Sequence, residues 1–245
     1  MNLVKTLGGV ALAAVFATSA MADNHAVRLG TEDAYAPYNF INDNGEVDGF
    51  EREVGDELCT RAKLECTWVT NEWDSIIPNL VSGNYDAILA GMSITAERDE
   101  VIDFTQEYFP PDPSTYVALA DADAKVLMGI VAAQAATIQA SHVSDSGATL
   151  VEFATPDEVV AAVRNGEVDA ALADDAFWQD IVKDSDSELV FIGDSVMIGG
   201  GIGMGIRESD GELKGKMDAA IASMKADGTL STMIAKCFDG HMVKY

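Results

Sequence analysis

The sequence predicts an α/β fold built as two similar lobes, each with a mixed, mostly parallel sheet flanked by helices. Short apolar runs alternate with helix-length segments along the chain, a spacing typical of parallel strands joined by crossover helices. In addition, LVSGNYDAILA from Leu80 and VRNGEVDAALA from Val163 share one pattern of helix end, glycine, aspartate and short apolar strand. Helix–glycine–strand segments occur in any α/β protein, but we expect these two to be structurally equivalent, one in each lobe.

The first half of the chain contains most of the recognisable elements. Periodicity and turn residues predict, in order, a strand at 27–31, an aromatic loop at 35–40, a turn at 43–45, a helix from about 49 to 62, a strand at 67–69, a helix that ends near 81, a strand at 86–90, a helix from 96 and a proline-rich stretch at 110–114. Asp74 is a candidate N-cap of the helix that ends near residue 81. Pro78 is tolerable only near the first turn of that helix.

Residues 1–22 have the composition of a signal peptide and are not expected to belong to the fold. Lys5 gives a positive start, residues 7–17 are apolar, and Ala20-Met21-Ala22 fits a cleavage site of small residues. A membrane helix is the alternative, but the apolar stretch is shorter than the roughly 18 residues that a span needs. We therefore expect cleavage after Ala22 and export to the periplasm, with no membrane-spanning segment.

The chain is strongly acidic, with a formal net charge of −26 at pH 7. Such a surface repels nucleic acid and anionic membranes, so we expect neither as a partner. An anion can then be held only where positive groups gather locally. Because 48% of the residues are hydrophobic, the chain is expected to be globular rather than disordered. We also expect it to be a monomer.

Cys59 and Cys66 flank a segment predicted as a helix end, a turn and a strand start, in ELCTRAKLECTWV. In an oxidising compartment we expect a disulfide that closes this connection. A zinc site is the alternative, but no histidine is near and the spacing is not that of a CxxC motif. We expect no metal and no cofactor, and Cys237 is left as a single buried thiol.

Charged residues follow the two apolar strands that the repeated pattern contains. The first strand leads into Gly91-Met92-Ser93 and then Arg98, and the second ends at Asp174. Ligands of open parallel sheets bind outside the carboxyl ends of the strands. Arg98, beside a helix N-terminus near Ala96, suits a carboxylate, and Asp174 suits an ammonium, so the pair suits an α-amino acid. As alternatives, Arg98 pairs with a neighbouring acid, Glu97 or Asp99, and Asp174 caps the helix that follows it.

The mature chain resembles the periplasmic amino-acid-binding proteins of ABC importers. GTEDAYAPYNF, GEVDGFEREVGDEL, EWDSIIPNLVSGNYDAILAGMSITAERDEVIDFT, GEVDAALAD and GIGMGIR stand in the order found in that family. The resemblance implies a type II periplasmic-binding-protein fold, with a first lobe of 23–112 plus 206–245 and a second lobe of 115–203. Two hinge crossings, near 112–115 and 203–207, would join the lobes. Several family members have a disulfide where Cys59 and Cys66 stand.

The resemblance also assigns ligand-binding roles. Arg98 would pair with the α-carboxylate of the ligand, with the Ser93 hydroxyl beside it, and Asp174 would take the α-ammonium. Tyr35 and Trp73 match two aromatic positions between which the ligand side chain stacks.

Four further positions complete the site that the resemblance implies. Glu32 stands where receptors for basic amino acids carry an acid that binds the distal cation, the charged group at the end of the ligand side chain. Ala90 and Gly91 replace hydroxyl residues, so their backbone carbonyls would serve as contacts. Thr137 belongs to the turn of the second lobe that reaches the carboxylate, although Ala136 stands where the family has a glycine.

These features together predict a binding protein and not an enzyme. We expect it to capture an amino acid between the lobes, preferably a basic one such as arginine or lysine, and to deliver it to an ABC transporter permease and its ATPase. A polar neutral amino acid or a zwitterionic osmolyte such as ectoine is the alternative ligand. A periplasmic dehydratase on the same scaffold is the alternative from another class, and a receptor that signals to a membrane sensor is a third possibility.

Overall fold

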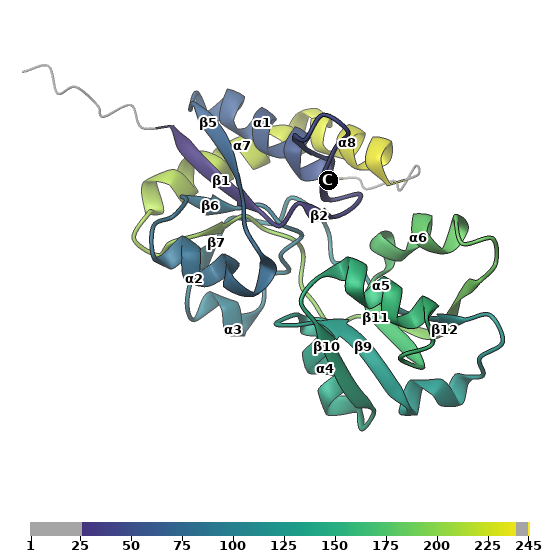
Figure 1. Ribbon diagram of the computed structural model, residues 1–245. Helices are drawn as coiled ribbons and strands as arrows, with labels where there is room; N and C mark the ends of the chain where they lie inside the picture. The colour runs from purple at the N-terminus through teal and green to yellow at the C-terminus, as the bar shows by residue number, and fades with distance from the viewer. Residues whose placement is uncertain (1–25, 239–244) are drawn as a thin grey trace, which may run out of the picture.

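Two five-stranded sheets form the two halves of the molecule (Figure 1). The first has the order β5-β1-β6-β13-β7, with the strands Cys66–Thr70, Val27–Thr31, Ala87–Ile88, Gly205–Ile206 and Asp103–Phe104. The second has the order β10-β9-β11-β8-β12, with the strands Thr149–Phe153, Ile130–Gln134, Ala170–Asp174, Ser114–Leu119 and Leu189–Val196. A small third sheet joins β2 to β4, with the strands Ala34–Tyr35, Asn39–Ile41 and Val47–Asp48.

The structure, a computed structural model, describes residues 26–238 and 245. The predicted signal peptide and its cleavage after Ala22 lie outside the described residues. None of the helices within 26–238 combines the length and the apolarity needed to span a bilayer.

Both sheets are mixed, as predicted. In the first sheet β1 runs parallel to β5 and β6, while β13 is antiparallel to β6 and β7. In the second sheet β9 runs parallel to β10 and β11, while β8 is antiparallel to β11 and β12. The antiparallel pairs of these two sheets therefore all involve β8 or β13, the strands with which the chain enters a sheet after leaving the other one.

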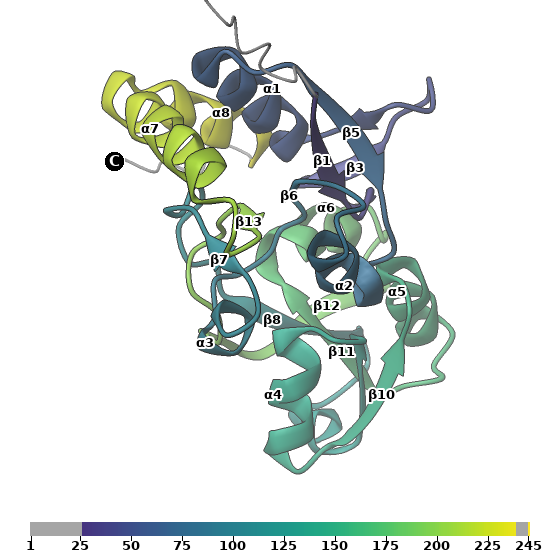
Figure 2. The same ribbon diagram turned by 90° about the vertical axis from the view of Figure 1, so that its left-hand side faces the viewer.

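Helices cover both sheets. They are α1 (Phe50–Ala62), α2 (Ile76–Val81), α3 (Ala96–Asp99), α4 (Ile138–Ser146), α5 (Pro156–Arg164), α6 (Asp175–Lys183), α7 (Gly211–Asp227) and α8 (Thr229–Cys237), with 3₁₀ turns at Trp73–Ser75 and Ala124–Met128. Figure 2 shows α1, α7 and α8 gathered on the first lobe, away from the second lobe. The predicted capping of α2 by Asp74 is wrong, because Asp74 lies inside the 3₁₀ turn that precedes this helix.

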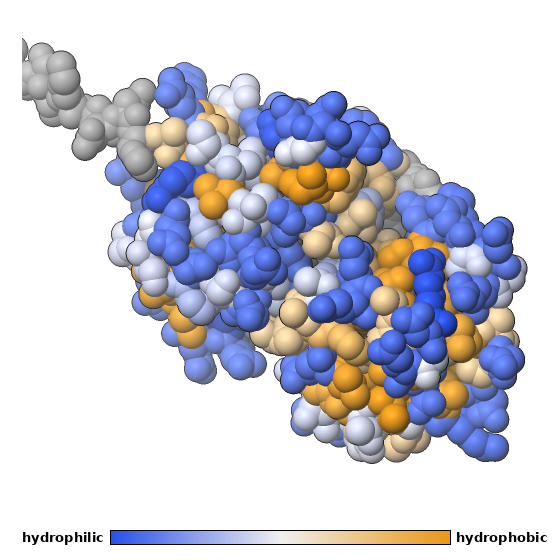
Figure 3. All heavy atoms as spheres, in the orientation of Figure 1, coloured by the Kyte–Doolittle hydropathy of each residue, from blue (hydrophilic) through white to orange (hydrophobic). Residues whose placement is uncertain are grey.

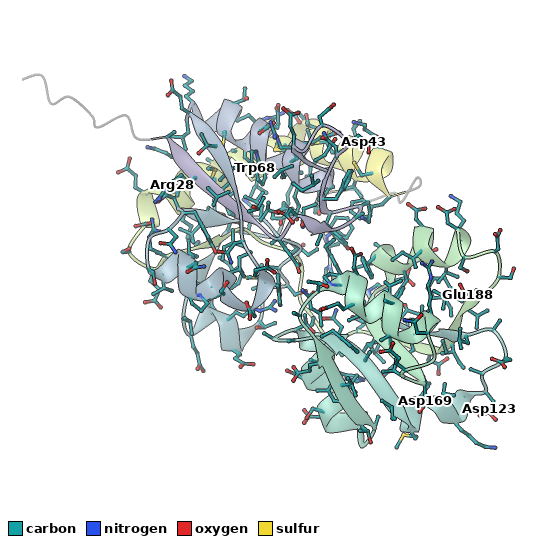
Figure 4. All side chains as sticks on the ribbon, viewed as in Figure 1. Arg28, Asp43, Trp68, Asp123, Asp169 and Glu188 are labelled. Atoms are coloured by element: carbon teal, nitrogen blue, oxygen red, sulfur yellow. A yellow bond between two sulfur atoms is a disulfide. The ribbon has the colours of Figure 1, made fainter. Side chains whose placement is uncertain are left out.

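The repeated sequence pattern corresponds to a repeated set of hydrogen bonds. The Asp86 carboxylate accepts the backbone N–H of Arg28 at 2.9 Å, and the Asp169 carboxylate accepts that of Ile130 at 2.7 Å. In both cases the aspartate precedes one strand and ties it to the start of its parallel neighbour, β6 to β1 and β11 to β9. Figure 4 labels Arg28 and Asp169, which lie at the ends of the lobes away from the region where the lobes meet.

Two adjacent connections join the sheets. The chain leaves the first sheet after β7 and enters the second at β8, and it returns between β12 and β13. The two connections are paired with each other, since Ile202 N–H donates to the Phe109 carbonyl at 2.9 Å and Tyr108 N–H donates to the Ile202 carbonyl at 2.8 Å. The exact lobe limits near 112–115 and 203–207 stay predictions.

The Cys59–Cys66 disulfide is confirmed. It joins the last turn of α1 to the first residue of β5, with a Cα–Cα distance of 6.2 Å. Lys63, between them, has a left-handed backbone conformation (φ +57°) that reverses the chain. Cys237 is free, and it is only partly buried because it is the last residue of α8.

Hydrophilic and hydrophobic side chains are unevenly distributed over the surface visible in Figure 3. In the view of Figure 3 the first lobe is mostly hydrophilic, and the hydrophobic residues that reach the surface gather mainly on the second lobe. The apolar side chains otherwise pack into separate clusters under the two sheets. One cluster, which includes Leu29 and Phe50, lies in the first lobe, and another, which includes Val163 and Trp178, lies in the second. Each lobe thus has its own core.

Asp86 should matter more for stability than its counterpart Asp169. Arg28 and Arg207 both place a guanidinium nitrogen 3.0 Å from Asp86 Oδ1, whereas Asp169 is exposed and has no ion pair among the described residues. Asp86→Asn should lower the free energy of unfolding by about 2 kcal/mol, and Asp169→Asn by less than about 1 kcal/mol. Urea unfolding of the ligand-free protein measures both, and equal losses would contradict this account.

The effect of Asp86 should also depend on pH. Burial raises its pKa, but hydrogen bonds from Arg28 and Arg207 outweigh burial and lower the pKa to about 2. The stabilisation is therefore present above about pH 4, the range of an unfolded aspartate, and is lost as the pH falls toward about 2. The difference between wild type and Asp86→Asn should shrink over that interval.

Candidate functional site

A cavity lies between the lobes, lined by Glu32, Tyr35, Trp73, Ala90, Gly91, Ser93, Arg98, Gln134, Thr137, Ile138, Gln139 and Asp174. All nine residues that the sequence singled out as ligand-binding line it. The sequence did not single out Gln134, and it placed Ile138 and Gln139 only in the turn around Thr137. Residues from Glu32 to Arg98 belong to the first lobe, and those from Gln134 to Asp174 to the second.

Arg98 is a partly buried cation in the wall of this cavity. Its guanidinium donates to the Ser93 carbonyl at 2.9 Å and lies 5.3 Å from the centre of the Trp73 ring. Within the described residues it forms no ion pair, so the structure does not support the alternative in which Glu97 or Asp99 takes its charge. Burial lowers its pKa to about 10, which leaves it charged at neutral pH. Arg98 is therefore available to hold an anion.

The helix beside Arg98 contributes less than the sequence suggested. α3 has only four residues, Ala96–Asp99, so its dipole is weak. Thr95 caps it, since the Thr95 hydroxyl accepts the N–H of Arg98 at 3.2 Å. This cap fixes the backbone of Arg98 and so helps to aim its side chain at the cavity.

Asp174 presents a carboxylate from the opposite lobe. It ends β11 and stands at the N-cap position of α6, but its side chain makes no capping hydrogen bond, which argues against the helix-cap alternative. Instead it accepts hydrogen bonds from the Tyr35 hydroxyl at 2.9 Å and from Gln139 Nε2 at 2.9 Å. Burial raises its pKa to about 7. A cation in the cavity would favour the ionised form.

Glu32 is a second carboxylate in the same cavity. It follows β1 and is 8% exposed. Its Oε1 accepts a hydrogen bond from Gln134 Nε2 of the other lobe. Burial raises its pKa to about 7, and the nearby acids Asp33, Glu72 and Glu51 add to the rise. Like Asp174, Glu32 would be stabilised by a positive ligand group.

The two aromatic residues have protein partners of their own. The Tyr35 ring stacks on Phe177 with centroids 4.4 Å apart and an interplanar angle of 5°. Trp73 Nε1 donates to the Ala136 carbonyl of the other lobe at 3.2 Å. Both rings line the cavity, but stacking of a ligand between them stays a prediction.

The turn before α4 explains why a glycine would suit position 136. Ala136 has φ +58°, in the left-handed region that only glycine enters without strain. Thr137 then caps α4, since its hydroxyl accepts the N–H of Ala140 at 3.1 Å and donates to the Gln134 carbonyl at 2.7 Å. Thr137 lines the cavity as predicted, but its hydroxyl already has both these partners.

Glu51 supports the site from behind, a role that the sequence did not reveal. Its side chain is fully buried in the first turn of α1. Its carboxylate accepts the backbone N–H of Gly91 and the amide of Asn39, each at 2.7 Å, together with the Tyr108 hydroxyl. Burial raises its pKa. The three donors compensate for the buried carboxylate and fix the Gly91 turn, whose backbone faces the cavity.

The side chains that line the cavity can recognise charged groups of a ligand. Within residues 26–238 and 245, no three histidine, cysteine or acidic side chains are arranged to hold a metal ion. The cavity instead brings together a guanidinium from one lobe and carboxylates from both lobes. Two α/β lobes joined by two connections, with such a cavity between them, define a two-lobe periplasmic-binding-protein fold.

The comparisons with known proteins identify the family. Residues 27–240 match the model of the bacterial extracellular solute-binding proteins, family 3, and the chain belongs to this family. It is 32% identical to the L-arginine-binding protein of Pseudomonas aeruginosa over 256 residues, which covers 97% of each chain. It is 31% identical to the histidine-binding periplasmic protein of Salmonella typhimurium over 227 residues, which covers 87% of each chain.

A solved structure of a relative is also similar. It is a periplasmic binding protein of the His/Glu/Gln/Arg/opine family from Silicibacter pomeroyi in complex with lysine. The two chains are 68% identical, with a TM-score of 0.87, and the match covers 89% of this chain and all of the other. The prediction of a binding protein in this family, and not of an enzyme, agrees with these relatives.

Proposed function

We propose that this protein captures a basic L-amino acid between its two lobes in the periplasm and delivers it, as a monomer, to the permease and ATPase of an ABC importer. The observation that carries the proposal is the balance of charge among the side chains that line the cavity. Arg98 contributes one positive charge to the cavity, and Asp174 and Glu32 contribute two negative charges, which leaves a net charge of −1 when all three are ionised. A basic amino acid carries the opposite net charge.

Each ligand group then has a partner. The α-carboxylate pairs with the Arg98 guanidinium, which can bind it through two parallel hydrogen bonds. The α-ammonium pairs with Asp174, and the distal cation pairs with Glu32. Charges of this kind are expensive to bury alone, so a ligand that supplies all three counter-charges is favoured over one that supplies two.

Closure of the lobes supplies the rest of the mechanism. Hydrogen bonds join three pairs of residues from lobe to lobe around the cavity: Tyr35 with Asp174, Trp73 with Ala136, and Glu32 with Gln134. They form only when the lobes are close, and bending at the two paired connections would break all of them together. The closed, loaded shape is what a permease can distinguish from the open, empty one.

The relatives support a basic ligand. The Silicibacter pomeroyi protein was solved with lysine, and an ancestral arginine-binding protein, 28% identical with a TM-score of 0.81, was solved with arginine. A polar neutral amino acid is the second candidate, because the pKa of Glu32 near 7 lets this group take up a proton and so match an uncharged amide. An ancestral arginine-binding protein was also solved with glutamine.

Arg98→Ala should remove binding of amino acids in general. With the guanidinium gone, the α-carboxylate would be buried without a partner, and the affinity for lysine should fall by at least about a hundredfold. Calorimetry on protein refolded free of carried-over ligand measures this, with circular dichroism to verify the fold. Arg52→Ala is the matched control, since Arg52 lies on the outer face of α1 and pairs with Asp56 there. Unchanged lysine affinity in Arg98→Ala would contradict the proposal.

Glu32→Gln should weaken only ligands with a distal cation, by at least about tenfold for lysine and hardly at all for glutamine. Lysine affinity should also fall from about pH 8 to pH 6, because burial raises the pKa of Glu32 to about 7 and the group must lose its proton to pair with a cation. Asp174 is proposed to meet the α-ammonium, which every amino acid carries, so its titration should change lysine and glutamine affinity alike. The pH dependence of glutamine binding therefore measures the effect of Asp174 alone.

Calorimetry at several pH values distinguishes the two carboxylates. In the wild type the pH slope for lysine should exceed the slope for glutamine, and in Glu32→Gln the two slopes should be equal. Equal slopes in the wild type would mean that Glu32 does not face the distal group.

A further inference from the structure

One contact at the edge of the cavity bears on which cation the protein prefers. Glu32 of the first lobe and Gln134 of the second are each 8% exposed, and Gln134 Nε2 donates to Glu32 Oε1. The same nitrogen donates to the Ala154 carbonyl at 3.2 Å. Because both partners of this nitrogen are acceptors, the orientation of the amide is fixed, and its N–H groups must point at them.

The contact leaves the two oxygens of Glu32 unequal. Oε1 carries the hydrogen bond from Gln134, whereas no group among the described residues donates to Oε2. The carboxylate is buried in the cavity wall, so Oε2 is the oxygen best placed to meet a ligand cation. A guanidinium makes its strongest contact with both oxygens of a carboxylate at once, while an ammonium is a point charge that one oxygen can satisfy.

We propose that Gln134 is a specificity-determining residue, which makes this cavity prefer a basic amino acid with a distal ammonium, such as lysine, over one with a distal guanidinium, such as arginine. The inference rests on the proposed function, because it assumes that Glu32 faces the distal group. Gln134 acts by occupying Oε1 when the lobes close. The planar fork of a guanidinium then has to displace the amide or bind through one nitrogen only.

The experiment compares lysine and arginine by calorimetry on ligand-free wild type, Gln134→Leu and Gln139→Leu. Wild type should bind lysine more tightly than arginine by about tenfold or more, and Gln134→Leu, which frees Oε1, should shift this ratio toward arginine by about tenfold. Gln139 is the matched control, since it donates to Asp174 at the α-ammonium end. Gln139→Leu should weaken both ligands by the same factor and leave their ratio unchanged.

The possible outcomes separate the inference from the proposed function. If wild type binds both ligands equally well, or if Gln134→Leu leaves the ratio within twofold of the wild-type value, the role of Gln134 is wrong while a basic ligand stands. If wild type binds neither ligand, the proposed function fails and the inference fails with it. Should Gln134→Leu not fold, Gln134→Ala is measured in its place, and the same change in the ratio is required.

Discussion

The molecule is organised around a guanidinium and a carboxylate, both partly buried, that face one cavity from different lobes. Arg98 has no ion pair among the described residues, and the side chains that donate hydrogen bonds to Asp174 there are uncharged, among them Tyr35 and Gln139. Each charge is costly to bury without a counter-charge. A zwitterion between them supplies both counter-charges, so recognition of the ligand and closure of the lobes become the same event.

The fold positions these two charges with the same strand arrangement in each lobe. β6 leads towards the residues before Arg98, and β11 ends at Asp174, while Asp86 and Asp169 tie the starts of these strands to their neighbours. Because each lobe has its own core and its own tie, it can move as a unit. The paired connections at Phe109 and Ile202 are then the natural place for bending.

The sequence revealed the parts of the site that lie at strand ends, and not the contacts between lobes. Arg98 and Asp174 stand at or after the ends of apolar strands, and the family resemblance pointed to most of the other cavity residues but not to Gln134. The hydrogen bond between Glu32 and Gln134 joins residues 102 positions apart, and no local pattern predicts such a pair. The sequence did not predict the role of Glu51, because an acidic residue in a helix is usually exposed. Its burial is explained only by the three hydrogen-bond donors that surround its carboxylate.

The most direct test is a crystal structure of the ligand-free protein soaked or co-crystallised with lysine. One lysine should lie in the cavity between the lobes, with its carboxylate on the Arg98 guanidinium, its α-ammonium on Asp174 and its distal ammonium on Oε2 of Glu32. A ligand bound elsewhere, or one whose carboxylate does not touch Arg98, would contradict the claim that the two lobes hold a zwitterion by opposite charges.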